Sequence, residues 1–285
     1  DEGWDDVYEH IQRATLAYSL TKSLRVSDEF QEFLNDATLL TKAHSEKNKI
    51  LLDDIYVGQE LTGIDQNNNE SKTSVEKILA TFNIGSKYNI SGDDQSGKSS
   101  ILKKAFVTLR ERGFIPVYLK GTQHLYQGKL SNKVKDEFAY DYATDKSLDD
   151  YDTKRVVVLI DDFHKIKRKE KVLKELNAEY QSCILMVDDI FCLDVANEGL
   201  VVDFNRYRIR ELKASLRNKL IKNWLSIRED SENRNFGNDE LARIDEMTDL
   251  VEQSLGKMLG SGIMPAHPFF ILYVLSTYDF NVQPG

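Results

Sequence analysis

The stretch that decides the fold is Ile90-Ser91-Gly92-Asp93-Asp94-Gln95-Ser96-Gly97-Lys98-Ser99-Ser100, which contains the pattern G-x-x-x-x-G-K-S. A short strand is expected before it, at Tyr88–Ser91, and a helix after it, at Ser99–Glu111. Gly92 and Gly97 allow backbone angles that a Cβ would forbid, so the loop is able to turn its N–H groups inward. The following helix points its positive N-terminal end at the same space. The pattern therefore predicts a loop that wraps around a phosphate group.

Two residues of this loop carry most of its expected chemistry. Lys98 is placed to bridge the β- and γ-phosphate oxygens of a nucleotide, and the Ser99 hydroxyl is placed to ligate Mg²⁺. A glycine-rich turn with a surface lysine is the alternative interpretation. We expect every residue of the loop to help bind the nucleotide: Gly92, Asp93, Asp94, Gln95, Ser96, Gly97, Lys98, Ser99 and Ser100.

A second motif follows about 60 residues after Lys98, in Arg155-Val156-Val157-Val158-Leu159-Ile160-Asp161-Asp162. Five apolar residues in a row are typical of a central parallel strand, whose C-terminal edge faces the ligand crevice. Asp161 is then placed to hold Mg²⁺ through water, and Asp162 to polarise an attacking water, so that Lys98, Asp161 and Asp162 form the predicted catalytic set. The alternative for Asp162 is a solvated residue at a strand end.

Strands and helices alternate around these motifs. Further strands are expected at Ile115–Leu119, Cys183–Val187 and, from a weaker pattern, Tyr207–Leu212. Further helices are expected at Val134–Tyr142 and Glu170–Tyr180. This order predicts an α/β fold, a three-layer sandwich with a parallel sheet.

The flanking regions lack this alternation. Helical spacing within residues 4–50, for example at Trp4, Val7, Tyr8 and Ile11, predicts two or three N-terminal helices. The polar run Thr62–Ser74 predicts a loop, and a helix is expected at Thr73–Thr81.

Only helices are expected after Leu212, with Trp224 in their core and a markedly apolar last segment at Pro268–Tyr278. We therefore expect three parts. They are a helical segment or linker at 1–54, the α/β domain at 55–212 and a small all-helical subdomain at 213–285.

The amino-acid composition excludes several classes of protein. The 285 residues include 38 Lys and Arg against 47 Asp and Glu, a net charge of −9, which makes nucleic acid an unlikely partner. No apolar run approaches the roughly 18 residues that a membrane span needs. Cys183 and Cys192 fit a reducing compartment and have no partners at metal-ligand spacing, so no zinc site is expected. Because the chain begins with Asp1, we expect it to be a piece of a longer protein.

Taken in order, these motifs resemble those of the STAND class of P-loop NTPases, which includes the NACHT and NB-ARC proteins. Ile55-Tyr56-Val57-Gly58-Gln59-Glu60 resembles the hhGRE element that lies near the adenine in that class, with Gln59 in place of Arg. Gly262-Ile263-Met264-Pro265 resembles the G-x-P element whose proline touches the base. The resemblance spans most of the chain. It implies that Tyr56, Val57, Pro265 and His267 contact the nucleotide, His267 at the phosphates or the base.

The nearest resemblance is to the NTPase modules of bacterial antiphage STAND proteins. It implies ATP or ADP and Mg²⁺ as cofactors, a cytoplasmic location, and a switch that self-associates when a protein trigger binds. Effector and sensor domains would lie in the same full-length chain. Asp162 stands where many P-loop ATPases carry Glu, and Asp is one methylene shorter, so hydrolysis is expected to be weak.

Two other functions remain open from the sequence. One is a AAA+-like motor ATPase acting on protein or DNA, and the other is a scaffold that binds nucleotide without turnover. Arg206, Arg208 and Arg210 alternate onto one strand face, where they either contact phosphate or form a solvated stripe paired with acids. His164 is interpreted as a loop histidine near the crevice. NB-ARC proteins carry an arginine nucleotide sensor after the fourth strand, and here that strand is expected to end in Asp188-Asp189, so the sensor is absent or supplied elsewhere.

Overall fold

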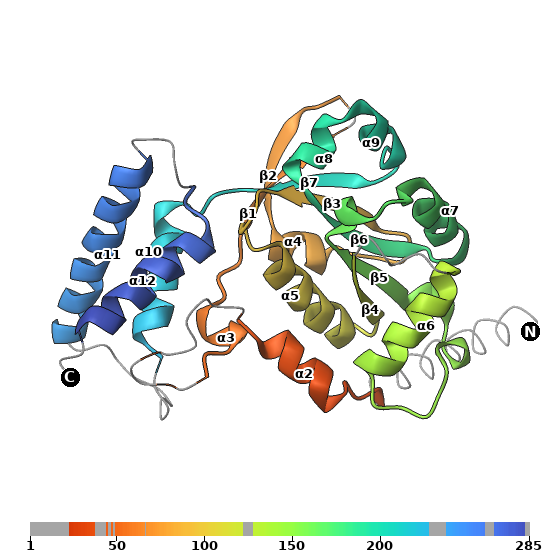
Figure 1. Cartoon of the computed structure of the whole chain (residues 1–285), viewed down its shortest axis with the longest axis horizontal. Coiled ribbons are helices and arrows are strands. Elements are labelled where there is room, and N and C mark those ends of the chain that lie inside the picture. Colours follow the sequence, from red (N-terminus) through yellow and green to blue (C-terminus); the bar gives the residue numbers. More distant parts are fainter. Residues whose placement is uncertain are drawn as a thin grey trace, which may run out of the picture.

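The computed structural model describes residues 23–37, 44, 47, 49–65, 67–121, 128–227, 238–259 and 265–282. Within these ranges seven strands form one sheet in the order β2-β1-β7-β3-β6-β5-β4 (Figure 1). The strands that pair in parallel are β3 (Lys87–Gly92), β4 (Ile115–Lys120), β5 (Val156–Asp161), β6 (Ser182–Asp188) and β7 (Asn205–Ile209). β6 separates β3 from β5, so the glycine-rich loop and the two carboxylates start from strands that are not neighbours.

Helices cover both faces of this sheet. α5 (Lys98–Glu111) lies on one face, and α6 (Leu130–Asp141) and α7 (Lys169–Glu179) lie on the other (Figure 1). All six residues of β5 are buried, as expected for an apolar strand between two helical layers. The predicted three-layer α/β sandwich is confirmed, and the predicted strands and helices within it are found with ends shifted by a few residues.

The prediction of a loop at Thr62–Ser74 is wrong. β1 (Glu60–Ile64) and β2 (Glu70–Ser74) form an antiparallel hairpin, and β1 also pairs antiparallel with β7. The turn is closed by Asp65, whose Oδ1 accepts hydrogen bonds from the backbone N–H groups of two residues of the turn at 2.8 Å. β2 is an exposed edge strand that packs little side-chain surface, so its polar sequence has no hydrophobic alternation to reveal it.

The other edge of the sheet, β4, is closed by the end of α6. The Tyr118 N–H donates to Asp141 Oδ2 at 2.8 Å, and the Tyr142 hydroxyl donates to the Pro116 carbonyl at 2.8 Å. Asp141 is completely buried, and burial raises the pKa of its carboxyl to about 8. These contacts satisfy backbone groups that a second strand would otherwise pair with.

Shorter helices join the strands of the sheet. α4 (Val75–Ala80) confirms the helix expected at Thr73–Thr81, whereas α8 (Asp189–Leu193) and α9 (Val195–Leu200) have no counterpart among the predictions. The strand expected at Tyr207–Leu212 ends at Ile209. The chain then leaves the sheet, and the Leu212 N–H donates to the Ala266 carbonyl, just before α12, at 2.9 Å.

Within the described residues, the C-terminal subdomain contains the helices α10 (Ala214–Leu225), α11 (Asn238–Leu259) and α12 (Pro268–Val282). They enclose a second hydrophobic core, separate from that of the sheet. Trp224 is fully buried at its centre, as predicted, and its ring lies edge-on to His44, with centroids 5.0 Å apart. None of the helices in the described ranges has the length and apolar character needed to cross a membrane.

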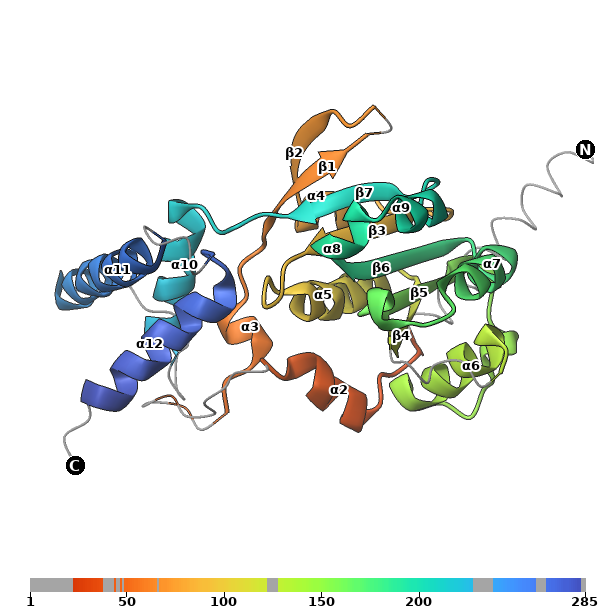
Figure 2. The ribbon, with the colours of Figure 1, turned by 45° about the horizontal axis from the view of Figure 1, so that its top comes forward.

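The N-terminal segment bridges the two cores (Figure 2). α2 (Asp28–Asn35) places Phe30 in the core of the sheet domain, with its ring 5.0 Å from that of Phe106. After α3 (Leu52–Ile55), Ile55 and Val57 enter the core of the helical subdomain instead. The expected helix at Trp4–Ile11 lies outside the described residues.

Candidate functional site

The glycine-rich loop connects β3 to α5, as predicted, and both of its glycines are required by the geometry. Gly97 has a φ of +98°, and a Cβ on it would lie 2.9 Å from Gln59 Oε1. A Cβ on Gly92 would lie 2.6 Å from Ser96 Oγ and 2.9 Å from Ile209 Cδ1. Gly97 is therefore required by its left-handed backbone, and Gly92 by neighbours that leave no room for a side chain.

Lys98 begins α5 and reaches back across the loop. Its Nζ donates to the carbonyl oxygens of Gly92 and Asp93, both at 2.7 Å. The side chain is buried, so the ammonium lies inside the loop at the positive end of a 14-residue helix. Two kinds of positive potential are therefore aimed at the same space, which suits an anion.

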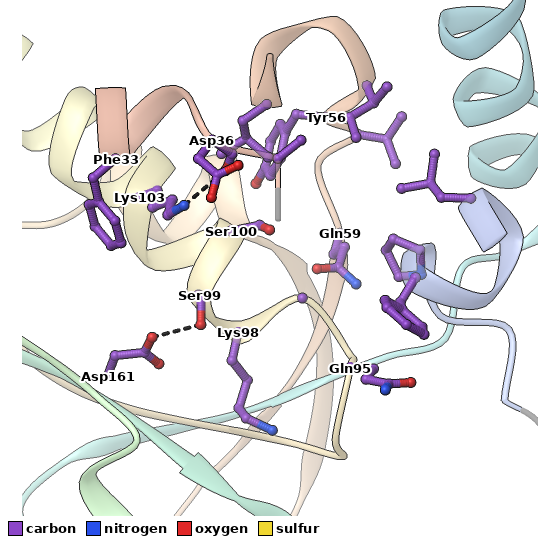
Figure 3. Close-up of a pocket in the computed structure, with 18 of the residues that line it drawn as sticks. Phe33, Asp36, Tyr56, Gln59, Gln95, Lys98, Ser99, Ser100, Lys103 and Asp161 are labelled. Atoms are coloured by element: carbon purple, nitrogen blue, oxygen red, sulfur yellow. Dashed lines mark hydrogen bonds between the residues drawn. The ribbon is translucent and has the colours of Figure 1, made fainter. Parts of the chain in front are cut away.

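Asp161 ends β5 and is buried opposite the loop. Its Oδ2 accepts a hydrogen bond from Ser99 Oγ at 2.6 Å and a second one from the Tyr118 hydroxyl at 2.7 Å. Its Oδ1 accepts from the Asp162 N–H at 3.0 Å. The fold thus joins the hydroxyl and the carboxylate that the two motifs supply from strands that are not adjacent (Figure 3).

Asp162 has a left-handed backbone conformation, with a φ of 51°. Its Oδ2 pairs with Lys165 Nζ at 2.8 Å, within the turn that follows. Across from it, Gly121 approaches so closely that a Cβ there would lie 2.4 Å from the Asp162 carbonyl oxygen. The carboxylate of Asp162 is partly exposed at the pocket but already has a cationic partner.

These groups line a pocket of about 510 Å³ between the sheet, the N-terminal segment and the helical subdomain. One end is polar and holds Lys98, Ser99 and Asp161 (Figure 3). The other walls are largely apolar. They are formed by Phe33, Ala37, Leu52, Ile55, Tyr56 and Val57 from the N-terminal segment and by Pro268, Phe269 and Leu272 from α12.

The pocket brings together most of the residues that the sequence predicted. Those that line it are Tyr56, Val57, Asp94, Gln95, Gly97, Lys98, Ser99, Ser100, Asp161 and Asp162. Gly92, Asp93, Ser96, Pro265 and His267 do not line it. The first three of those lie in the same loop, where Gly92 and Asp93 offer their carbonyl oxygens to Lys98.

His267 is buried next to the loop instead. Its Nε2 lies 3.9 Å from Asp93 Oδ2, and burial lowers the pKa of its imidazole. The segment that contains it is held by Glu211, whose Oε2 accepts from the Ala266 N–H at 3.1 Å. Gly262, Ile263 and Met264 of the proposed G-x-P element lie outside the described residues.

Some residues that line the pocket are not indicated by the sequence motifs. Tyr118 donates to Asp161, and Lys103 Nζ donates to the Asp36 carbonyl at 2.8 Å while lying 4.3 Å from the centroid of the Phe33 ring. Burial lowers the pKa of the Lys103 ammonium. Lys103 follows Ser99 by four residues, one helical turn, and that spacing is the signal that would have placed it on the same face. Nothing in the sequence pairs Phe33 with this site.

The remaining candidates lie at surface contacts. Arg208 pairs with Asp189 at 2.9 Å, and Arg206 donates to the Asp65 carbonyl at 2.7 Å. Arg210 donates to Thr62 Oγ1 at 3.3 Å. His164 Nδ1 accepts from the Asp188 N–H at 3.2 Å. These contacts favour the interpretation of the arginine stripe as a solvated strand face.

Comparison with known proteins assigns the chain to no family. No protein-family model matches the chain, and no curated protein does either. Among solved structures, AMPPCP-bound DnaA from Aquifex aeolicus is 18% identical over 62% of this chain, with a TM-score of 0.35. The Thermotoga maritima RuvB Holliday junction branch migration motor is 13% identical over 75% of this chain and 70% of its own, with a TM-score of 0.37. Saccharomyces cerevisiae RIF2 is 15% identical over 72% of this chain and 79% of its own, with a TM-score of 0.41.

The chain spans 59% of the length of that DnaA chain. Likeness at this level carries no inference about activity or partners. The unit formed by β3, the glycine-rich loop and α5 is itself the strand–loop–helix arrangement of a P-loop.

Proposed function

We propose that this chain is an ATP-binding switch module of the STAND kind, with weak hydrolysis. The observation that carries the proposal is that one pocket joins three parts of the molecule. Lys98 and Ser99 come from the sheet domain, Tyr56 from the N-terminal segment, and Phe269 from the helical subdomain. A nucleotide bound there would contact all three, so its presence would bias how they are held together.

The residues present suit a nucleoside triphosphate. The polar end has the loop N–H groups, the helix N-terminus and the Lys98 ammonium for phosphates, and the apolar walls are suited to a base. The Tyr56 hydroxyl is buried, with no hydrogen-bond partner among the described residues, and so leaves a polar group for a ligand. A volume of about 510 Å³ is within the usual range for small-molecule sites.

Ser99 and Asp161 would hold Mg²⁺, since a hydroxyl and one carboxylate are a typical protein share of its coordination. No group of three or more His, Cys, Asp or Glu suited to a metal is found within the described ranges, and Mg²⁺ bound with phosphates needs none. Mg²⁺ supplies charge neutralisation at the phosphates when bound. The Lys98 ammonium would then exchange the Gly92 and Asp93 carbonyls for phosphate oxygens.

Slow hydrolysis is supported by the state of Asp162. Its carboxylate is paired with Lys165, and it is a short side chain for reaching a water beyond the phosphates. A carboxylate that must leave its ion pair before it reaches a water contributes less to hydrolysis than a free one. The nucleotide would therefore persist long enough to hold one conformation.

The resemblance to STAND proteins extends this proposal to partners. In this reading ATP binding and a protein trigger together permit self-association, which activates an effector domain in the same full-length chain. The resting chain, in the cytoplasm, holds ADP or ATP. Sensor and effector domains would lie in parts of the chain beyond this sequence.

The first test is to purify the chain without added nucleotide, denature it, and identify the released ligand by chromatography and mass. Released ATP or ADP supports the switch. An assembly that grows with an ATP analogue and Mg²⁺ but not with ADP, followed by light scattering, supports the role in self-association. Rapid turnover of about 1 s⁻¹ or more would favour the AAA+-like motor instead. A chain that neither carries nor binds nucleotide would overturn the proposal.

A further inference from the structure

We infer that Tyr118 is a positioning residue for Asp161, and that it links the metal side of the pocket to helix α2. The inference rests on the proposed nucleotide site and adds a residue that neither motif contains. Tyr118 lies on β4, lines the pocket and is almost completely buried.

The first observation is the hydrogen bond to Asp161. The Tyr118 hydroxyl and Ser99 Oγ donate to the same oxygen, Asp161 Oδ2, at 2.7 and 2.6 Å. The Asp162 N–H occupies the other oxygen at 3.0 Å. The carboxylate therefore has donors on both oxygens, and these fix its rotamer before any ligand arrives.

The chemistry of the phenol suits this role. The phenol hydroxyl of Tyr118 has one proton to donate, and it donates that proton to Asp161 Oδ2. Ser99 is the residue whose oxygen a metal would recruit. Tyr118 is the donor that stays on Asp161 whether or not Ser99 turns toward a metal, so it is the more constant support.

The second observation is the packing of the same ring against α2. The Tyr118 ring lies edge-on to Phe33, with centroids 5.0 Å apart and planes at 69°. It also lies 6.1 Å from the ring of Phe30, which enters the sheet core. Lys103 Nζ lies over the Phe33 ring, 4.3 Å from its centroid, and donates to the Asp36 carbonyl just after α2 (Figure 3).

One side chain thus contacts both the metal-facing carboxylate and the helix that leads toward the N-terminus. A shift of Asp161 on metal binding would move the Tyr118 hydroxyl, and the tightly packed ring would pass that shift to Phe33. The N-terminal side of the chain would in this way respond to Mg²⁺ at the nucleotide.

The test is Tyr118→Phe, which removes the hydroxyl and keeps the ring. Binding of AMPPNP is measured by calorimetry, once with Mg²⁺ and once with EDTA. Loss of a second partner of a metal-binding carboxylate typically costs about tenfold or more in metal affinity. We therefore expect the gain in AMPPNP affinity on adding Mg²⁺ to fall about tenfold, with affinity in EDTA unchanged.

Tyr140→Phe is the matched control. Tyr140 also packs on Phe30, with centroids 6.0 Å apart, but is well exposed and makes no contact with Asp161 among those described. It should leave the Mg²⁺ dependence as in the unmodified chain. A merely structural role for Tyr118 would lower affinity equally in Mg²⁺ and in EDTA, and that result would overturn the inference.

The link to α2 is tested by hydrogen exchange of residues 28–35. In the unmodified chain with AMPPNP, adding Mg²⁺ should slow exchange in α2, and in Tyr118→Phe this change should be lost. Equal exchange with and without Mg²⁺ in the unmodified chain would overturn the link. If the unmodified chain binds no AMPPNP at all, the proposed function fails. If it binds, and Mg²⁺ strengthens binding equally in both proteins, only the role of Tyr118 fails.

Discussion

Gln59 Nε2 donates a 2.8 Å hydrogen bond to the Ser96 carbonyl, and both side chains are buried. The contact joins the segment before β1 to the centre of the phosphate loop. Gln59 Oε1 lies against Gly97, where an added Cβ would come within 2.9 Å of that oxygen. The element that resembles hhGRE therefore supports the loop directly, with an amide in place of a guanidinium.

Replacing Gln59 by Ala should loosen the loop. The buried Ser96 carbonyl would lose its donor, at a cost of about 1–3 kcal/mol in the free energy of unfolding. Nucleotide affinity should fall several-fold, because the loop is no longer held in its binding shape. Denaturant unfolding and calorimetry measure the two effects. Gln31→Ala, at an exposed glutamine of α2 that bonds Asn35, is the control and should change neither.

Lys98→Ala should abolish tight nucleotide binding. The Lys98 ammonium is the charged donor at the phosphate end, and two charge-assisted hydrogen bonds are together worth about 3 kcal/mol or more, roughly a hundredfold in Kd. Calorimetry with an ATP analogue and Mg²⁺ measures the loss. Lys135→Ala, which removes a surface lysine paired with Asp149, is the control. Unchanged affinity in Lys98→Ala would contradict the assignment of the site.

Asp162→Ala should slow hydrolysis and spare binding. If Asp162 polarises the attacking water, phosphate release should fall about tenfold or more, while the Kd for an ATP analogue stays the same. Asp149→Ala breaks another exposed Asp–Lys pair and should leave turnover unaltered. A normal hydrolysis rate in Asp162→Ala would mean that Asp162 has no part in hydrolysis and serves only in its ion pair with Lys165.

Phe269→Ala tests whether the helical subdomain touches the nucleotide. Phe269 lines the pocket from α12, and loss of its apolar surface should weaken nucleotide binding by about tenfold. Tyr273→Ala removes a neighbouring aromatic ring of the same helix, 48% exposed and not part of the pocket lining. Equal affinities in the two variants would mean that the nucleotide does not bridge the subdomain.

Asp141 should make stability depend on pH. Its pKa is about 8 in the folded chain, against a reference value of 3.8, because burial favours the neutral carboxyl. Between these values the unfolded chain has released a proton that the folded chain keeps. The contribution of Asp141 to the free energy of unfolding therefore falls as pH rises from about 4 to about 8, by about 1.4 kcal/mol per unit at its steepest.

Asp141→Asn should remove this contribution, since the amide oxygen still accepts from the Tyr118 N–H. The measurement is denaturant unfolding of both proteins between pH 5 and pH 8, which brackets most of the window. The difference in stability between the variant and the unmodified chain should grow in favour of the variant as pH rises. Asp136→Asn, at an exposed position of the same helix, should give a difference that does not change with pH.

Much of the fold could be predicted because its signals are local. The run Val156–Ile160 is a buried strand by composition, and the glycines of the phosphate loop leave few other conformations. The hairpin of β1 and β2 could not be predicted in this way. β2 is polar and exposed, and only its pairing with β1 makes it a strand.

The candidate site also has one part that local sequence signals predict and one part that they do not. By itself the sequence determined that Lys98 and Ser99 lie at a helix start after a strand, and that Asp161 ends a buried strand. Backbone geometry and hydrophobicity act over a few residues, so a short stretch of sequence is enough to predict these positions. Only the tertiary structure decided that Tyr118 bonds Asp161, and that α2 and α12 wall one pocket. Such contacts depend on how separate elements pack, and packing is a property of the whole chain that no short stretch contains.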